Sequence, residues 1–155
     1  MSIVPFPEDD YLIKLGKVVY SMAYHEWGII GDLLYIIDND KIPGIEITRQ
    51  EVEKLFSKPS GKIAEFFTQK STVVSDADLK RWLEVAGDAL GIIGKRNDVI
   101  HSYPITNNNS KQRLYRTKKH FEISDDFLDN TISELSNLCS DVGSLRLLFN
   151  KIAVP

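Results

Sequence analysis

The stretch LKRWLEVAGDALGIIGKRNDVIHS, from Leu79 to Ser102, decides the fold because its apolar residues recur with the period of an α-helix. At about 100° per residue, these residues fill one half of a helical wheel, and acidic and lysine residues fill the other half. We predict a long helix with Ser75 as its N-cap and Asp78 in its first turn, running to about Ser102 before Pro104. Its apolar half consists of Leu79, Trp82, Val85, Ala86, Ala89, Leu90, Ile92, Ile93, Val99 and Ile100.

Three polar residues near the end of this helix lie with the apolar residues. Arg96 and Asn97 fall inside the apolar half of the wheel, and His101 lies at its edge, one turn after Asn97. A second helix, predicted from Glu8 to Asp38, carries a matching anomaly because Glu26 falls within its apolar stripe. A buried carboxylate without a partner costs several kcal/mol, so we predict that the two helices pack together and that Glu26 pairs with Arg96. A purely structural ion pair is an equally good interpretation of these two residues.

The remaining segments complete a helical bundle. Thr48 and Glu51 form a capping box that starts a short helix, and Pro59–Gly61 predicts a turn before the short helix KIAEFFTQ. The segments SYPI and QRLYRTK, on either side of TNNNS, predict a small β-hairpin, and Ser124 caps a last long helix. The expected fold class is all-α, a helical bundle with three long helices, one or two short helices and a small β-hairpin before the last helix.

Length and composition predict one globular domain that spans residues 1–155. The apolar share of 43% and the charged share of 26% are ordinary for a folded soluble protein. The net charge of −3 gives no general attraction to polyanions, so any contact with nucleic acid has to use a local basic patch. No apolar run approaches the length of a membrane span, and the first residues lack the pattern of a secretory signal. We therefore expect a cytoplasmic protein without a membrane partner.

A basic patch follows the predicted helix in the segment KQRLYRTKKHF. Its cations surround a tyrosine, and cations with an aromatic ring suit single-stranded RNA through phosphate contacts and base stacking. A charged edge strand, protected against unwanted pairing, is the alternative interpretation. The three histidines of the chain show no metal-ligand spacing, so we predict no metal and no cofactor. The candidate RNA-binding residues are Lys111, Arg113, Tyr115, Arg116, Lys118 and Lys119.

Arg96, Asn97 and His101 in the sequence RNDVIH resemble the signature of HEPN (higher eukaryotes and prokaryotes nucleotide-binding) domains. That signature is an arginine, four to six further residues and a histidine, with a polar residue directly after the arginine. The resemblance implies a helical bundle that forms a homodimer, in which two motifs face each other and make a composite active site. It implies a metal-independent endoribonuclease with Arg96, Asn97 and His101 as catalytic residues.

The same resemblance implies a biological setting and an alternative. Many members are toxins or phage-defence components, so an antitoxin such as a small nucleotidyltransferase is an expected partner beside RNA. Other members have lost activity, and an inactive dimerisation or RNA- or partner-binding module is therefore the alternative. A DNA-binding regulator is less favoured because no recognition helix with a basic face is evident.

The chemistry of RNA cleavage fits these residue types. Attack by the 2′-hydroxyl needs a base for its proton and an acid for the leaving 5′-oxygen, and histidine serves as either. An arginine offers fixed donors to the phosphate as negative charge builds, which suits Arg96. Asn97 is placed to orient His101 or to bind a phosphate oxygen. Glu26 lies outside the family's motif, and we predict that it supports Arg96 or tunes His101.

Overall fold

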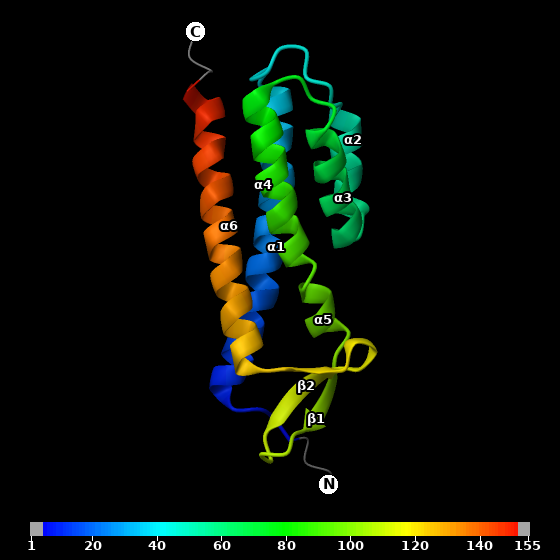
Figure 1. Ribbon diagram of the computed structural model, residues 1–155, viewed down its shortest axis with the longest axis vertical. Coiled ribbons are helices and arrows are strands. Elements are labelled where there is room, and N and C mark those ends of the chain that lie inside the picture. Colours follow the sequence, from blue (N-terminus) through cyan, green and yellow to red (C-terminus); the bar gives the residue numbers. More distant parts are fainter. Residues whose placement is uncertain (1–4, 152–155) are drawn as a thin grey trace.

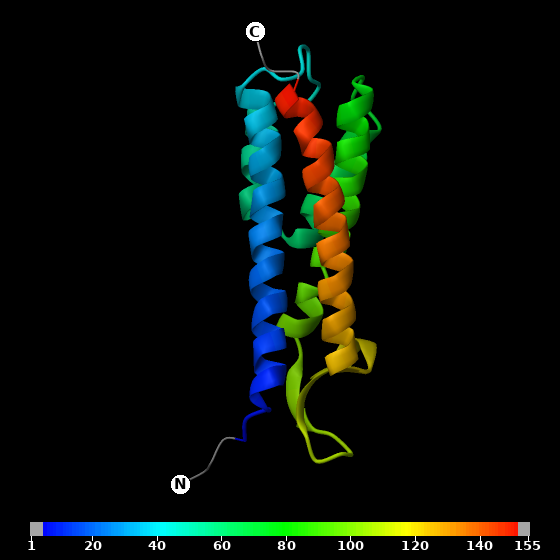
Figure 2. The same ribbon diagram turned by 90° about the vertical axis from the view of Figure 1, so that its left-hand side faces the viewer.

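Three long helices form the body of the molecule. In the computed structural model of the protein, which describes residues 5–151, α1 and α6 run in the same direction and α4 runs in the opposite direction (Figure 1). Each of the three contacts the other two, and Figure 2 shows the same elongated bundle from the side. The predicted helical bundle is thereby confirmed. Its long helices are α1 (Asp9–Asp38), α4 (Ala77–Ile93) and α6 (Asp125–Lys151).

Shorter helices cover one side of this bundle. The capping box is confirmed, because the Thr48 hydroxyl accepts from the Glu51 amide at 3.2 Å and the Glu51 carboxylate accepts from the Thr48 amide at 2.9 Å. The predicted turn at Pro59–Gly61 is wrong, because Pro59 occupies the N-cap position and Ser60 already begins a helix. The fixed φ of proline suits that position. The elements are α2 (Arg49–Glu53), the 3-10 helix η1 (Lys54–Ser57) and α3 (Ser60–Ser71), which packs on α4.

The predicted third long helix is divided into two helices. It ends as α4 at Ile93 and resumes as the short helix α5 (Arg96–Ile100), as Figure 1 shows. With α2 and α3, the described residues therefore contain three short α-helices, where one or two were predicted. Gly94 lies at the break, where the low helix propensity of glycine makes the interruption inexpensive. The predicted N-cap is also wrong by one residue, because the Asp76 carboxylate accepts from the Leu79 amide at 2.8 Å.

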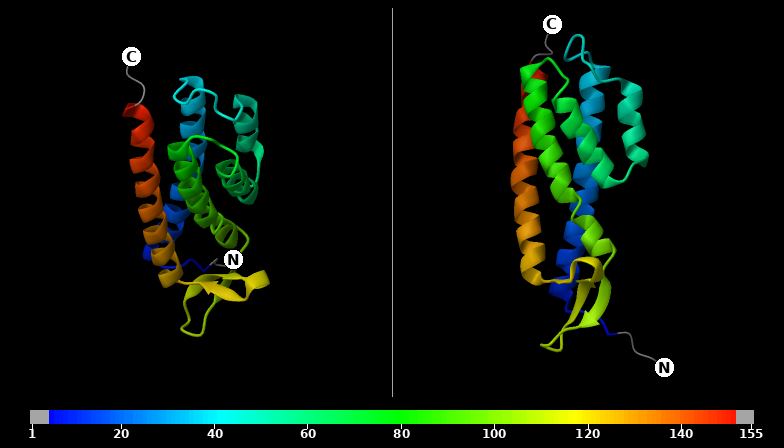
Figure 3. Two further views of the ribbon diagram at one scale, coloured as in Figure 1. Left: turned by 45° about the horizontal axis from the view of Figure 1, so that its top comes forward. Right: turned by 45° about the vertical axis from the view of Figure 1, so that its right-hand side comes forward.

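A three-stranded antiparallel sheet lies across the end of the bundle where α1 begins (Figure 3). The predicted hairpin is confirmed as β1 (Tyr103–Thr106) and β2 (Gln112–Arg116), and β3 (Phe121–Ile123) is a strand that the sequence pattern did not predict. The Tyr11 hydroxyl joins the sheet to α1, because it donates to the Ile123 carbonyl at 2.6 Å and accepts from the Leu114 amide at 3.0 Å. The sheet is therefore fixed to the bundle.

The core runs along the whole bundle without interruption. Trp82 lies in it on α4, with the rings of Phe67 from α3 and Phe149 from α6 centred 5.9 Å and 6.3 Å away. Gly87 lets α3 approach α4 closely, because a Cβ atom there would lie 3.1 Å from the Thr68 hydroxyl.

The Ser124 hydroxyl accepts from the Phe127 amide at 3.0 Å, which confirms the predicted cap of α6. None of the helices that the structure describes is both long and apolar enough to cross a membrane.

Candidate functional site

Arg96 enters a buried polar network between three helices. Its guanidinium donates to the Ser60 hydroxyl at 2.8 Å and lies 3.4 Å from the Glu26 carboxylate, and the Ser60 hydroxyl donates to the same carboxylate at 2.6 Å. The side chains of Arg96 and Glu26 are only 19% and 6% exposed. The predicted contact between Glu26 and Arg96 is confirmed. Ser60 is the third member, which sequence analysis missed because it placed a turn where α3 begins.

Asn97 and His101 point in a different direction from Arg96. Both are exposed, so the prediction that the whole motif points inward is wrong for these two residues. The break at Gly94 resets the helical phase, and residues five apart on a helix lie about 140° apart around its axis. Because Arg96 faces α1, His101 faces away from α1. Asp98, which the wheel placed on the polar side, is buried instead.

Asn97 and His101 line an open pocket of about 700 Å³ between α5 and the end of β2. Both residues are exposed in this pocket, where a ligand can reach them. The pocket therefore brings a histidine and an amide together with cationic side chains. Its remaining lining residues are Ile100, Ser102, Tyr103, Arg116, Thr117 and Lys118.

The buried Asp98 fixes the cationic side of this pocket. Its carboxylate accepts from Arg116 Nε at 3.2 Å and pairs with Lys119 Nζ at 2.8 Å. Arg116 Nη1 also donates to the His101 backbone carbonyl at 3.2 Å. These contacts hold the end of β2 against α5. Arg116 uses two of the five N–H donors of a guanidinium in these two bonds, which leaves donors for an anion in the pocket.

The predicted RNA-binding residues divide between two ends of β2. Arg116 and Lys118 line the His101 pocket, and Lys119 is joined to it through Asp98. Tyr115 is half-buried on the opposite face of β2 from Arg116, since side chains alternate along a strand.

Arg113, which was predicted to bind RNA, is paired within the protein instead. Arg113 is buried, with its guanidinium 2.6 Å from the Glu8 carboxylate, 2.9 Å from the Asp125 carboxylate and over the ring of Tyr11 at 4.3 Å. Lys111 lies near this cluster, with its amine 3.5 Å from Glu8. The hydrogen bond from Arg113 lowers the pKa of Glu8 from 4.5 to about 2. Strand alternation cannot reveal such a partner 105 residues away in the sequence.

Within residues 5–151, no group of three or more His, Cys, Asp and Glu side chains is arranged to hold a metal ion. Comparison of the chain with protein-family models, with curated proteins and with solved structures finds no match. The resemblance to HEPN domains therefore depends on the residues from Arg96 to His101 and on the helical architecture around them.

Proposed function

We propose that the protein is a metal-independent endoribonuclease of HEPN type that uses His101 in the pocket between α5 and β2. The observation that carries the proposal is the exposed His101 of the RNDVIH motif beside Arg116 and Lys118. A histidine next to cations in an open pocket suits a phosphodiester, because the cations attract the phosphate and the imidazole exchanges protons near neutral pH. The Arg116 guanidinium is positioned by Asp98, so its remaining donors are fixed in direction.

The reaction needs no group other than the RNA, the protein and water. The 2′-oxygen bonds to phosphorus while its proton passes to a base, and the bond from phosphorus to the 5′-oxygen breaks as that oxygen takes up a proton. His101 serves as one of these two proton-transfer groups, and a water molecule serves as the other. The cations stabilise the negative charge that builds on the phosphate, and Asn97 donates to a phosphate oxygen. The products end in a 2′,3′-cyclic phosphate and a 5′-hydroxyl.

Arg96 has a positioning role in this proposal. Its guanidinium is turned toward Glu26 and Ser60, away from the pocket, so it holds α5 on α1 instead of touching the phosphate. Glu26 supports the site in the same way. A rigid α5 matters because a displacement of about 1 Å in a catalytic group has large effects on rate.

The same observation favours the second candidate function, an inactive HEPN-like module that binds RNA or a protein partner. The family resemblance implies that both Arg96 and His101 act on the phosphate. Because Arg96 is paired with Glu26, only His101 of these two residues lines the pocket. Arg116 and Lys118 then bind an RNA phosphate without cleavage. The two candidates differ in the fate of the RNA, which an assay separates directly.

The test is incubation of RNA with purified protein in EDTA, using matched variants of two exposed histidines. His101 lines the pocket and His120 does not. Because His120 has a φ of 55°, asparagine is among the few residues with a side chain that its backbone tolerates, and His101→Asn and His120→Asn therefore form a matched pair. We expect cleavage by the wild type and by His120→Asn and no cleavage by His101→Asn. RNA binding without cleavage by all three proteins supports the inactive module, and the absence of both binding and cleavage contradicts the ribonuclease and the RNA-binding module.

The composite active site of a homodimer stays a prediction from the family resemblance. Mixing His101→Asn subunits with Arg116→Ala subunits tests it, since a composite site regains activity in the mixed dimer and independent pockets do not. A role as a toxin or phage-defence component, with RNA as target and an antitoxin as partner, is the setting that we propose. Growth arrest on expression of the wild type but not of His101→Asn is the expected result.

A further inference from the structure

The His101 pocket combines exposed apolar side chains with cations. Tyr103, at the start of β1, and Ile100, on α5, both line it, and they are 65% and 55% exposed. Arg116 and Lys118 supply its positive charge, and none of its lining residues within the described part of the chain is a carboxylate. A nucleotide has the same two halves, because the faces of its base stack on aromatic rings and its phosphate is an anion.

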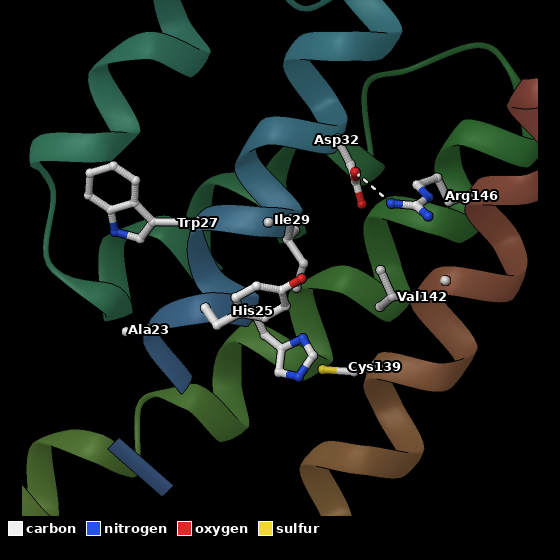
Figure 4. A pocket seen from close by; sticks show the side chains of 11 residues that line it. Ala23, His25, Trp27, Ile29, Asp32, Cys139, Val142 and Arg146 are labelled. Atoms are coloured by element: carbon white, nitrogen blue, oxygen red, sulfur yellow. Dashed lines mark hydrogen bonds and ion pairs between the residues drawn. The ribbon is translucent and has the colours of Figure 1, made fainter. Parts of the chain in front are cut away.

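The open groove between α1 and α6 has an aromatic wall, but its arginine is neutralised (Figure 4). Arg146 forms an ion pair of 3.0 Å with Asp32, which lines the same groove. Trp27, on the wall of the groove, already packs on Phe56, with the two ring centres 4.9 Å apart. This groove therefore attracts a phosphate less than the His101 pocket does.

The chain places Tyr103 close to His101. Only Ser102 separates the two residues, so their Cα atoms lie at most about 7 Å apart. Tyr103 also lies directly opposite Tyr115 in the pairing of β1 with β2. Side chains at such a position point to the same face of the sheet with Cβ atoms about 5 Å apart, so the half-buried Tyr115 restricts the ring of Tyr103 on one side. The tyrosine and the histidine can therefore touch the same nucleotide.

We infer that the base of the nucleotide beside the cleaved bond stacks on the ring of Tyr103. The phosphate of that nucleotide then lies against Arg116 and Lys118, within reach of His101, and Ile100 adds an apolar contact. The base has to be unpaired, because both faces of a paired base are covered by its neighbours in a duplex. Its identity matters little, since every base has a face that stacks.

This subsite deepens the proposed function and rests on it, because it requires that RNA binds in the His101 pocket. It serves the ribonuclease and the RNA-binding module alike. Tyr103 takes no part in proton transfer and acts as a residue that selects and positions the substrate. Its contribution is therefore measured as binding, apart from cleavage.

Binding of a fluorescent RNA of ten uridines, followed by anisotropy, tests the stack. All proteins carry His101→Asn so that the RNA stays intact. Tyr24 supplies the matched control, because it is also 65% exposed and lines the other groove. We expect a dissociation constant roughly five- to 150-fold higher for Tyr103→Ala and an unchanged constant for Tyr24→Ala. Tyr103→Phe should retain the affinity because it keeps the ring.

An RNA backbone of ten ribose phosphates without bases separates stacking from other effects. Tyr103→Ala should bind this abasic RNA as tightly as the background protein does, because no base is present to stack. A loss of the same size on both RNAs shows that the tyrosine acts through the phosphates or the fold, and that result overturns the inference. An unchanged affinity of Tyr103→Ala for the uridine RNA overturns it as well.

The inference and the proposed ribonuclease fail in different ways, because cleavage by proteins that retain His101 is scored separately. Cleavage by the wild type, beside unchanged binding by Tyr103→Ala, leaves the ribonuclease standing and removes the subsite. Weaker binding of the uridine RNA alone by Tyr103→Ala, without cleavage by the wild type, supports the subsite in the RNA-binding module. If the background protein does not bind the uridine RNA at about 1 mM, above the usual range for non-specific binding, the subsite is overturned.

Discussion

Removing Arg96 is expected to destabilise the protein through the carboxylate that it leaves behind. In Arg96→Met, Glu26 keeps only the hydrogen bond from Ser60, in a site where its side chain is 6% exposed. Breaking one partner out of a buried pair costs about 3–5 kcal/mol, and the remaining hydrogen bond places the expected loss near the lower value, about 3 kcal/mol. For a domain of this length such a loss lowers Tm by roughly 6–12 °C.

A double-mutant cycle isolates this effect. Glu26→Gln removes the charge but keeps a group that hydrogen-bonds Ser60, so the double variant Glu26→Gln/Arg96→Met leaves no buried charge behind. We expect the double variant to be at least about 2 kcal/mol more stable than Arg96→Met alone, measured by urea unfolding followed by circular dichroism. Additive losses, or a loss below about 1 kcal/mol for Arg96→Met, refute the reasoning. If the double variant regains RNA cleavage together with stability, Arg96 acts by positioning α5. If it regains stability alone, Arg96 contacts the phosphate directly.

Three further predictions concern pH, reactivity and the fixed cations. Because Arg113 lowers the pKa of Glu8 from 4.5 to about 2, the stabilisation from Glu8 is complete above pH 4.5 and is lost as pH falls toward 2. In Arg113→Met, an NMR titration should show the pKa of Glu8 shifted back toward 4.5. Burial raises the pKa of Cys139 to about 11, so iodoacetamide should alkylate it at pH 8 roughly a hundredfold more slowly than a free cysteine, as mass spectrometry measures. Asp98→Asn should cost about 1–3 kcal/mol in urea unfolding and speed hydrogen exchange at the end of β2, because Arg116 and Lys119 lose the negative charge of their buried partner. Unchanged exchange contradicts that role.

Helical periodicity predicts most of this fold because the long helices bury one continuous face. It also predicts the contact between Glu26 and Arg96, since a buried charge demands a partner. It fails after Gly94, where a short break changes the phase of every later residue and exchanges the places of Asn97 and Asp98. A wheel assumes one unbroken helix, so it cannot show which of the residues after the break face α1.

The site residues that sequence analysis missed or misplaced depend on contacts between distant segments. Ser60 joins the network because α3 begins at the height of Glu26 on α1, which no local pattern indicates. Alternation places Arg113 and Arg116 on opposite faces of β2, but it does not show which face is buried. A carboxylate from the start of α1 covers Arg113, and Asp98 holds Arg116 at the pocket. The exposed side of α1 resembles a core stripe because Tyr24 and Trp27 are apolar enough for either place.

The central claim is that His101 cleaves RNA without a metal. The measurement that tests it most directly is mass spectrometry of the RNA ends produced in EDTA by the wild type and by His101→Asn. The account predicts 2′,3′-cyclic phosphate ends from the wild type and intact RNA from the variant. Equal cleavage by both proteins, or 3′-hydroxyl ends from the wild type, contradicts it.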